Sequence, residues 1–482
     1  MNLRKMSLFL IVVLCLFLLV NSLVSAGTIP NPQTDKADVS GLETFTYLPV
    51  VFNRYANIVA PIGVQMYDNT GTSSPYHAGL VESGTSWVRV QVNWSDVEPT
   101  RTSPPTYLWN TANNAFAVAR EDMGGLNVIG TIRYIPSWAA AGPEQPIYPD
   151  RYDEFAQFVT ALVERYDADG INDAPGSPKV TYWELFNEPD RFNFWGHSGD
   201  EFADLLKVVY PAVKSADSSA KLVFPGIAYD FFEDQNGPFT RSFLTDVLNN
   251  GGGNYFDVMN FHSYPIFYTN WTTNKGPGLL EKGQHIQAIL AGYNLTKPIV
   301  VTETGWHSNN PPGSTIPGSP QIQSRYVIQL LTQGYALDAQ FVIWWMYYDV
   351  EGGYPYDNGL VTKDGSPGST TPKQAYYIFK DFTETVGSAN FVRKLAITET
   401  GLPELEAYEF DDTVNNKRVY VAWLNPVTAS GTVSLRLPVS QALVRNPIAN
   451  LQFTVLDGGD GKNDGHITVQ VGANPIYVEV NK

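Results

Sequence analysis

The sequence predicts a (β/α)8 TIM barrel followed by a small all-β, sandwich-like domain. Two observations support this prediction. From about residue 58 onward, eight short apolar runs alternate with segments of helical periodicity, and from about residue 391 short strand-like runs separated by turn residues replace them. Eight strand–helix repeats can close a parallel sheet into a barrel, whereas strands without intervening helices form a sandwich. A doubly wound open sheet is the alternative, but no glycine-rich phosphate loop follows the first run.

The apolar runs are the expected barrel strands: residues 58–66, 87–94, 127–134, 180–187, 221–228, 257–264, 298–304 and 340–348. The segments between them are amphipathic. In DEFADLLKVVYPAVKSA, for example, Phe202, Leu205 and Val209 recur at helical spacing. The later runs, such as LEAYEF, RVYVAWLN and GTVSLRLP, predict antiparallel strands. We therefore place the barrel at residues 56–386 and the β-sandwich domain at residues 387–482.

The first 26 residues predict a secretory signal peptide. Arg4 and Lys5 precede an apolar run, and Val24-Ser25-Ala26 supplies the small residues of a cleavage site. A retained membrane anchor is the alternative, because the run approaches the ~18 apolar residues of a spanning helix. The cleavage site favours removal, and hence a secreted protein with no stable membrane insertion. Residues 27–55 are a predicted linker or N-terminal extension: residues 27–44 are polar and contain proline and glycine, and a short apolar stretch follows them.

The composition disfavours several classes of binding partner and cofactor. The formal net charge of −17 disfavours binding to nucleic acid or to anionic membranes. The only cysteine, Cys15, lies in the signal segment, which leaves no thiol chemistry in the mature chain. The six histidines are scattered, so we expect no metal and no cofactor. Aromatic residues make up 13% of the chain and favour a neutral partner such as a carbohydrate, although core packing also explains them.

Two glutamates lie at the ends of predicted barrel strands, where functional groups of such barrels gather. Glu188 follows the fourth run and Glu303 ends the seventh. Cleavage of a glycosidic bond needs such a pair: one carboxylic acid protonates the leaving oxygen, and one carboxylate acts opposite it. Each glutamate alone is equally well explained by a helix cap or an arginine pair. The tetrapeptide TETG recurs at Glu399, beyond the eighth run, so we expect chemistry only from Glu303.

Three stretches, YWELFNEPD, FDVMNFHSYP and PIVVTETGW, resemble the strand 4, 6 and 7 motifs of clan A retaining glycoside hydrolases. The chain is most similar to glycoside hydrolase family 39 or a close relative, over about residues 58–482. The resemblance implies cleavage of β-linked poly- or oligosaccharides, with Glu188 as acid/base and Glu303 as nucleophile. It also implies that Arg89 holds Glu303 ionised. Glu188 should instead have a raised pKa and be protonated before attack.

The same resemblance implies roles for neighbouring residues. Asn187 would bind the substrate 2-hydroxyl, Tyr264 would hydrogen-bond the nucleophile, and His262 would line the site. Four tryptophans after strands 3, 4, 7 and 8 are candidate floors of sugar subsites, with core or loop packing as the alternative for each: Trp138, Trp195, Trp306 and Trp345.

Glu184 lies four residues before Glu188 and shares its side of a regular strand. We expect it to be a buried carboxylate that needs a partner, such as Arg89 or Arg133. A direct catalytic role is the alternative. Two rival functions also stay open: a carbohydrate-binding barrel without turnover, and a transglycosylase that uses the same carboxylate pair.

Overall fold

The computed structural model describes residues 60–67, 69–195, 199–271, 276–350, 355–363 and 370–482. The predicted signal peptide (1–26) and linker (27–55) lie outside these residues. Ala60–Lys482 form one compact unit.

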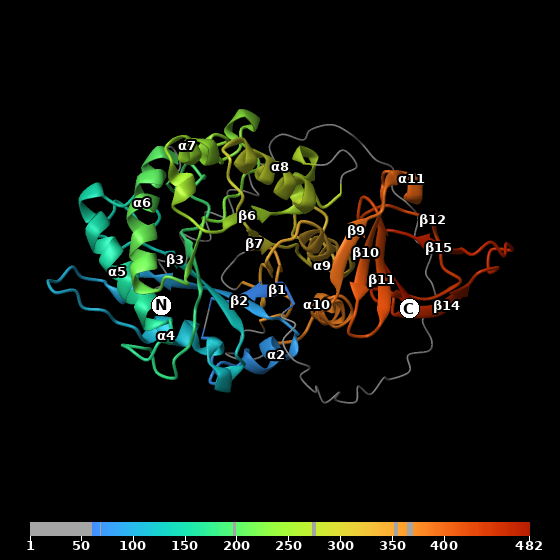
Figure 1. Cartoon of the computed structure of the whole chain (residues 1–482), viewed down its shortest axis with the longest axis horizontal. Coiled ribbons are helices and arrows are strands. Elements are labelled where there is room, and N and C mark those ends of the chain that lie inside the picture. Colours follow the sequence, from blue (N-terminus) through green and yellow to red (C-terminus); the bar gives the residue numbers. More distant parts are fainter. Residues whose placement is uncertain (1–59, 68, 196–198, 272–275, 351–354, 364–369) are drawn as a thin grey trace. The chain divides into compact units, whose positions relative to one another are not determined.

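The predicted barrel is confirmed (Figure 1). Its eight strands are β1 (Ile62–Gln65), β2 (Trp87–Asn93), β3 (Asn127–Arg133), β4 (Tyr182–Leu185), β5 (Lys221–Val223), β6 (Met259–Ser263), β7 (Ile299–Thr304) and β8 (Val342–Trp344). They form one parallel sheet in the order β5-β4-β3-β2-β1-β8-β7-β6. The parallel bridges Val223↔Val258 and Ile227↔Phe261 join the two ends and close the barrel. Each strand falls within one of the predicted runs.

Helices connect the strands. The α-helices are α2 (His77–Glu82), α3 (Trp94–Val97), α4 (Asn110–Ala115), α5 (Tyr152–Arg165), α6 (Gly199–Ala216), α7 (Phe243–Asn249), α8 (Leu279–Gly292), α9 (Pro320–Ala336) and α10 (Gln374–Thr385). Short 3-10 segments are η2 (Ala117–Ala119), η3 (Glu121–Met123), η4 (Pro149–Arg151), η5 (Glu233–Gln235), η6 (Gly252–Asn254) and η7 (Pro265–Asn270). Helix α5 shows why these segments fold as they do: Phe155, Phe158, Val159, Leu162 and Val163 recur along one face and are buried.

The barrel interior has two layers. An apolar cluster, which includes Trp87 stacked on Phe341 at 4.1 Å between ring centroids, fills the part near the strand starts. Further along the strands the interior becomes polar, with Arg89 and Glu184 both buried. Buried polar groups are costly unless they are hydrogen-bonded, so this second layer requires a network.

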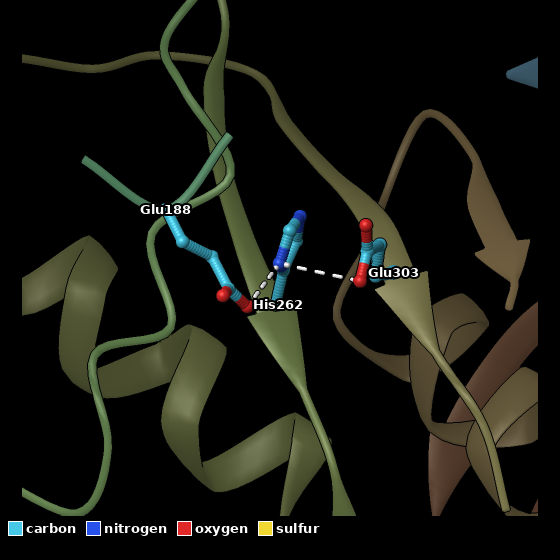
Figure 2. Close-up of side chains that lie close together, drawn as sticks. All are labelled: Glu188, His262 and Glu303. Carbon is cyan, nitrogen blue, oxygen red and sulfur yellow. Dashed lines mark hydrogen bonds and ion pairs between the residues drawn. The ribbon is translucent and has the colours of Figure 1, made fainter. Parts of the chain in front are cut away.

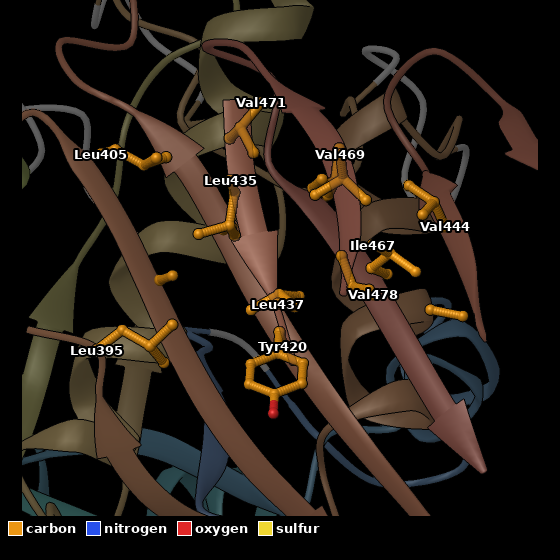
Figure 3. Packing of buried hydrophobic residues seen from close by; sticks show 14 residues of the cluster. Leu395, Leu405, Tyr420, Leu435, Leu437, Val444, Ile467, Val469, Val471 and Val478 are labelled. Atoms are coloured by element: carbon orange, nitrogen blue, oxygen red, sulfur yellow. The ribbon is translucent and has the colours of Figure 1, made fainter. Parts of the chain in front are cut away.

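The predicted β-sandwich follows the barrel (Figure 1), and Figure 3 shows the packing of its buried side chains. Its elements are β9 (Asn390–Lys394), α11 (Ile397–Thr400), β10 (Leu405–Asp412), β11 (Lys417–Leu424), β12 (Val433–Leu437), β13 (Gln441–Asn446), β14 (Leu451–Leu456), β15 (Ile467–Val471) and β16 (Ile476–Asn481). A six-stranded antiparallel sheet, β14-β13-β16-β11-β10-β9, faces the pair β12-β15. Leu435 and Val469 of the pair pack against Leu405 and Val478 of the larger sheet in one buried cluster. The fold class is therefore as predicted.

Helix α9 lies between the barrel and the sandwich. Its N-terminus is capped by Ser319, whose hydroxyl accepts from the amide of Ile322 at 3.1 Å. Near its other end, the side chain of Gln333 lies 3.4 Å from Glu406 and from Tyr408 of β10. Eleven of the 17 residues of α9 are buried, so most of its surface is covered. Across the described ranges, no helix is long and apolar enough to span a bilayer.

Candidate active site

Two carboxylates meet at the carboxyl end of the barrel strands, with a histidine between them (Figure 2). Glu303 lies on β7, Glu188 follows β4, and His262 lies on β6. The Nδ1 atom of His262 is 2.9 Å from Glu188 Oε1 and 3.7 Å from Glu303 Oε2. The closest oxygens of the two carboxylates lie within 4.8 Å of each other. The strands predicted to carry these side chains bring them together.

The backbone after β4 turns Glu188 into the site. Phe186 and Glu188 both have positive φ, 63° and 45°, a left-handed conformation that costs free energy in side-chain-bearing residues. The amide of Glu188 donates to the carbonyl of Gly226 at 2.9 Å, which holds the turn. Gly226 must itself be a glycine, because a Cβ there would lie 2.0 Å from Nε2 of His262. Such strain is common at functional sites.

Arg89 fixes Glu303. One terminal nitrogen of Arg89 donates to Glu303 Oε1 at 2.6 Å, and the Tyr264 hydroxyl donates to Oε2 at 2.9 Å. The other terminal nitrogen donates to Asn187 Oδ1 at 2.8 Å. Burial works to lower the pKa of Arg89, but the charges of Glu184 and Glu303 raise it above its ordinary value. A permanent buried cation is therefore hydrogen-bonded to the Glu303 carboxylate.

Glu188 differs from the sequence-based expectation. Burial does work to raise its pKa, but the hydrogen bond from His262 and the positive charges of His262, Arg191 and Arg133 outweigh burial. The net pKa of Glu188 is lowered, so the expectation of a raised pKa was wrong for the free protein. The motif identified Glu188 but carried no information about the charge on the neighbouring imidazole.

Asp190, two residues beyond Glu188, ties the loop after β4 to the segment after β5. Its carboxylate accepts from the amides of Ala228 at 3.2 Å and Tyr229 at 2.9 Å. The side chain is fully buried. Burial, together with the charge of Glu188, raises the pKa of Asp190 to about 7, although the two amide hydrogen bonds oppose this rise.

Two of the four candidate tryptophans lie at the site. The indole nitrogen of Trp345 donates to the Tyr67 hydroxyl at 2.8 Å, and its ring lies edge-on to Tyr264 with centroids 6.4 Å apart. Trp195 lines a small cavity beside Asn187 and Arg133.

The other two tryptophans make their contacts elsewhere. Trp138 donates to the carbonyl of Glu98 at 3.2 Å. Trp306 donates to the carbonyl of Pro317 at 2.9 Å and packs on Tyr326 of α9 at 4.9 Å. For Trp306, which is 6% exposed, the structure favours loop packing over a sugar subsite.

Sequence reasoning missed a set of polar side chains inside the barrel. Glu184 pairs with Arg89 at 2.7 Å, whereas Arg133 pairs with Glu144, so the first of the two suggested partners is correct. The missed residues are Gln65, Tyr67, Thr131, Asn260 and Thr302. A signal was present, because each is a polar residue within or just after an apolar run.

Two groups of described side chains bring three metal-type donors together: Glu188 with His262 and Glu303, and Asp167 with Asp169 and Asp173. In the first group the donors already have partners. Both oxygens of Glu303 accept hydrogen bonds, and Nδ1 of His262 faces Glu188. This arrangement suits nucleophilic attack and proton transfer by the side chains themselves.

The fold of this chain is shared with several solved glycoside hydrolases. No family model matches the chain. The chain is 20% identical over 258 residues to a β-xylosidase of Caldicellulosiruptor saccharolyticus, a match to 49% of each protein, so it spans about half the length of this curated relative. A family 39 glycoside hydrolase from the gut symbiont Bacteroides cellulosilyticus WH2 superposes with a TM-score of 0.65 at 17% identity, covering 88% of this chain and 81% of that one.

Two further structures share the fold. A monomeric β-xylosidase from Caulobacter crescentus CB15 has a TM-score of 0.56 at 14% identity and covers 88% of this chain and 96% of that one. The catalytic domain of GH30 xylanase C from Talaromyces cellulolyticus has a TM-score of 0.57 at 14% identity, with 88% and 97% covered. The likeness that the three motifs predicted is therefore confirmed at the level of the fold.

Proposed function

We propose that the protein is a retaining glycoside hydrolase that cleaves β-glycosidic bonds in poly- or oligosaccharides. The observation that carries this proposal is the separation of Glu188 and Glu303, whose closest oxygens lie within 4.8 Å. Retaining enzymes hold their carboxyl groups about 5–5.5 Å apart, whereas inverting enzymes need about 6.5–9.5 Å to admit a water molecule. The distance leaves room for a sugar carbon and no additional water.

The first step forms a glycosyl-enzyme. Glu303, ionised beside Arg89, attacks the anomeric carbon while the bond from that carbon to the leaving oxygen breaks. Glu188 supplies a proton to the leaving oxygen. Because Glu188 Oε1 is 2.9 Å from His262 Nδ1, the proton held by this pair passes to Glu188 as the leaving oxygen takes it up.

The second step releases the sugar. Attachment of the sugar removes the negative charge of Glu303, and Glu188, now a carboxylate, takes a proton from water. The resulting hydroxide attacks the anomeric carbon, and the bond to Glu303 breaks. Two inversions give net retention. Asn187, fixed by Arg89 at 2.8 Å, is positioned to bind the 2-hydroxyl of the sugar throughout.

The relatives indicate which substrates to test first. One is a β-xylosidase and another a xylanase, so β-xylosides are the first substrates to test. A screen would offer xylans, glucans, mannans, galactans and aryl glycosides to the purified protein. NMR of the first-formed product decides the mechanism: the β-anomer supports the proposal, and the α-anomer contradicts it.

The same screen separates the rival functions. Sugar binding without turnover of any substrate in the panel would identify a binding barrel. Glycosyl transfer to added sugars in preference to water would identify a transglycosylase.

We also propose that the protein is secreted after removal of residues 1–26. The support is the sequence pattern of charged, apolar and small residues. Mass spectrometry of protein collected outside expressing cells tests this. The measured mass should be that of a chain that begins at Gly27, and a chain that still begins at Met1 would contradict the proposal.

A further inference from the structure

Glu184 is the most heavily hydrogen-bonded carboxylate of the polar layer in the barrel. It lies on β4 and is fully buried. Oε2 accepts from Arg89 Nε at 2.7 Å and from the Thr131 hydroxyl at 2.5 Å. Oε1 accepts from Asn260 Nδ2 at 2.7 Å, from the Thr302 hydroxyl at 2.8 Å and from the amide of Gly226 at 3.2 Å. These donors come from β2, β3, β6, β7 and the segment after β5.

The Thr302 hydroxyl links this carboxylate to His262. Thr302 Oγ1 is 3.2 Å from His262 Nε2, and it also accepts from Asn260 Nδ2 at 2.8 Å. A hydroxyl has one proton to donate. The oxygens available to it are Glu184 Oε1 at 2.8 Å and Asn260 Oδ1 at 3.1 Å, and neither can donate a proton in return. The shorter contact to the charged oxygen is the stronger one.

The consequence is a fixed histidine tautomer. The only proton of the Thr302 hydroxyl is donated to a carboxylate or amide oxygen. The hydroxyl can therefore only accept a hydrogen bond from His262, so Nε2 of His262 must carry a hydrogen. The other ring nitrogen, Nδ1, is then the atom that gains and loses a proton. It is the atom that faces Glu188 at 2.9 Å.

We propose that Glu184 is a positioning residue that acts through Thr302 to hold His262 with Nε2 protonated, so that Nδ1 exchanges a single proton with Glu188. This inference rests on the proposed function for its catalytic consequence. Through Arg89 the same carboxylate also orients Glu303. One buried side chain thus positions Glu188, through His262, and Glu303, through Arg89.

Charged groups lie on several sides of the His262 ring. Glu188 and Glu303 face Nδ1 at 2.9 and 3.7 Å, and the charge of His262 acts on Asp190. Glu184 lies behind Thr302, and Arg89 lies beyond Glu303. Four carboxylates therefore lie around the ring, with Glu188 and Glu303 on the Nδ1 side and Glu184, through Thr302, on the Nε2 side.

Thr302→Val tests the link, because it keeps the shape of the side chain and removes the hydroxyl. Loss of a hydrogen bond to a charged group is worth about a factor of ten. The alkaline limb of the pH profile of kcat/KM should therefore move about one pH unit lower. For substrates with poor leaving groups, kcat/KM should fall about tenfold or more, and for activated aryl glycosides much less.

Two further variants separate positioning from structure. Thr302→Ser restores the hydroxyl and should restore the pH profile. Thr304→Val removes a buried hydroxyl from the same strand, one that donates to the carbonyl of Ser263 at 2.6 Å and does not contact His262. Its pH profile should match the wild type. Identical profiles for Thr302→Val and Thr304→Val would overturn the proposal.

The tautomer can be measured without activity. In protein labelled with 15N-histidine, the His262 signals are assigned by comparison with His262→Gln. At a pH where the ring is neutral, they should show a protonated Nε2 and a bare Nδ1. The reverse pattern in the wild type would overturn the proposal even if the protein is active. If the wild type hydrolyses no glycoside, the proposed function fails while this spectrum still decides the tautomer.

Discussion

Replacing Arg89 tests how the polar layer in the barrel is stabilised. Arg89 is 2% exposed and donates to Glu184 at 2.7 Å and to Glu303 at 2.6 Å. Arg89→Met preserves most of the side-chain volume but leaves Glu184 without its buried cation. Removing one partner of a buried ion pair costs about 3–5 kcal/mol. We expect the free energy of unfolding to fall by this amount.

A second substitution should recover part of the loss. In the Arg89→Met background, Glu184→Gln removes the uncompensated charge. The amide oxygen can still accept from Asn260 and Thr302 where Oε1 does now, and the amide nitrogen faces Thr131. The double variant should therefore be about 2 kcal/mol more stable than Arg89→Met alone, because replacing both members of a buried pair costs less than removing one.

Urea unfolding measures these differences, provided that the slope of the unfolding free energy against urea stays constant. Arg393→Met is the matched control: Arg393 also contacts two glutamates, Glu399 and Glu409, but its side chain is 46% exposed. An exposed ion pair contributes about 0–1 kcal/mol, so this variant should be nearly as stable as the wild type. Strictly additive effects of the Arg89 and Glu184 substitutions would refute the reasoning.

Three further predictions concern the carboxylates. Glu303→Ala should lower kcat by about 10⁴-fold or more, as loss of a nucleophile does, whereas Glu399→Ala, an exposed residue of α11, should retain wild-type rates; equal losses would show that the repeat was misjudged. Glu188→Ala should retain turnover of aryl glycosides with activated leaving groups, which need little protonation, and added azide should speed it; loss on all substrates alike would contradict an acid/base role. For Asp190, whose pKa rises from 3.8 to about 7 on folding, the unfolded chain binds fewer protons than the folded one between these values, so stability from this group falls as pH rises through that window. The stability of Asp190→Asn relative to the wild type, from thermal unfolding at pH 5 and pH 8, should therefore improve by about 3 kcal/mol at the higher pH, and a constant difference would show that Asp190 does not titrate in this way.

The barrel strands could be predicted because each is a compact apolar run bounded by turn residues. Glu188 and Glu303 could be predicted because functional groups of such barrels gather at the carboxyl ends of the strands, and both glutamates lie there. The charge state of Glu188 could not, because it depends on His262, which is 74 residues away along the chain. Electrostatic effects of this kind arise only when folding brings distant residues together.

The tryptophans show the same limit. Trp345 and Trp306 both follow strand ends, and their local sequences do not distinguish a sugar subsite from packing. What separates them is the partner of each indole nitrogen, Tyr67 for Trp345 and Pro317 for Trp306. The polar layer was missed for another reason: Asn260 and Thr302 interrupt apolar strands, and only the three-dimensional arrangement shows that both point at Glu184.

The enclosure of helix α9 makes the C-terminal sandwich inseparable from the barrel. On β13, Arg445 bonds to Asp381 at 2.7 Å and Thr385 at 2.6 Å on α10, next to the face through which α9 meets β10. A chain shortened to residues 1–386 would expose the surface of α9 that meets β10 and would remove the partners of Gln333. Both modules should therefore melt as one, and trimming the molecule for production would destroy the fold it was meant to simplify.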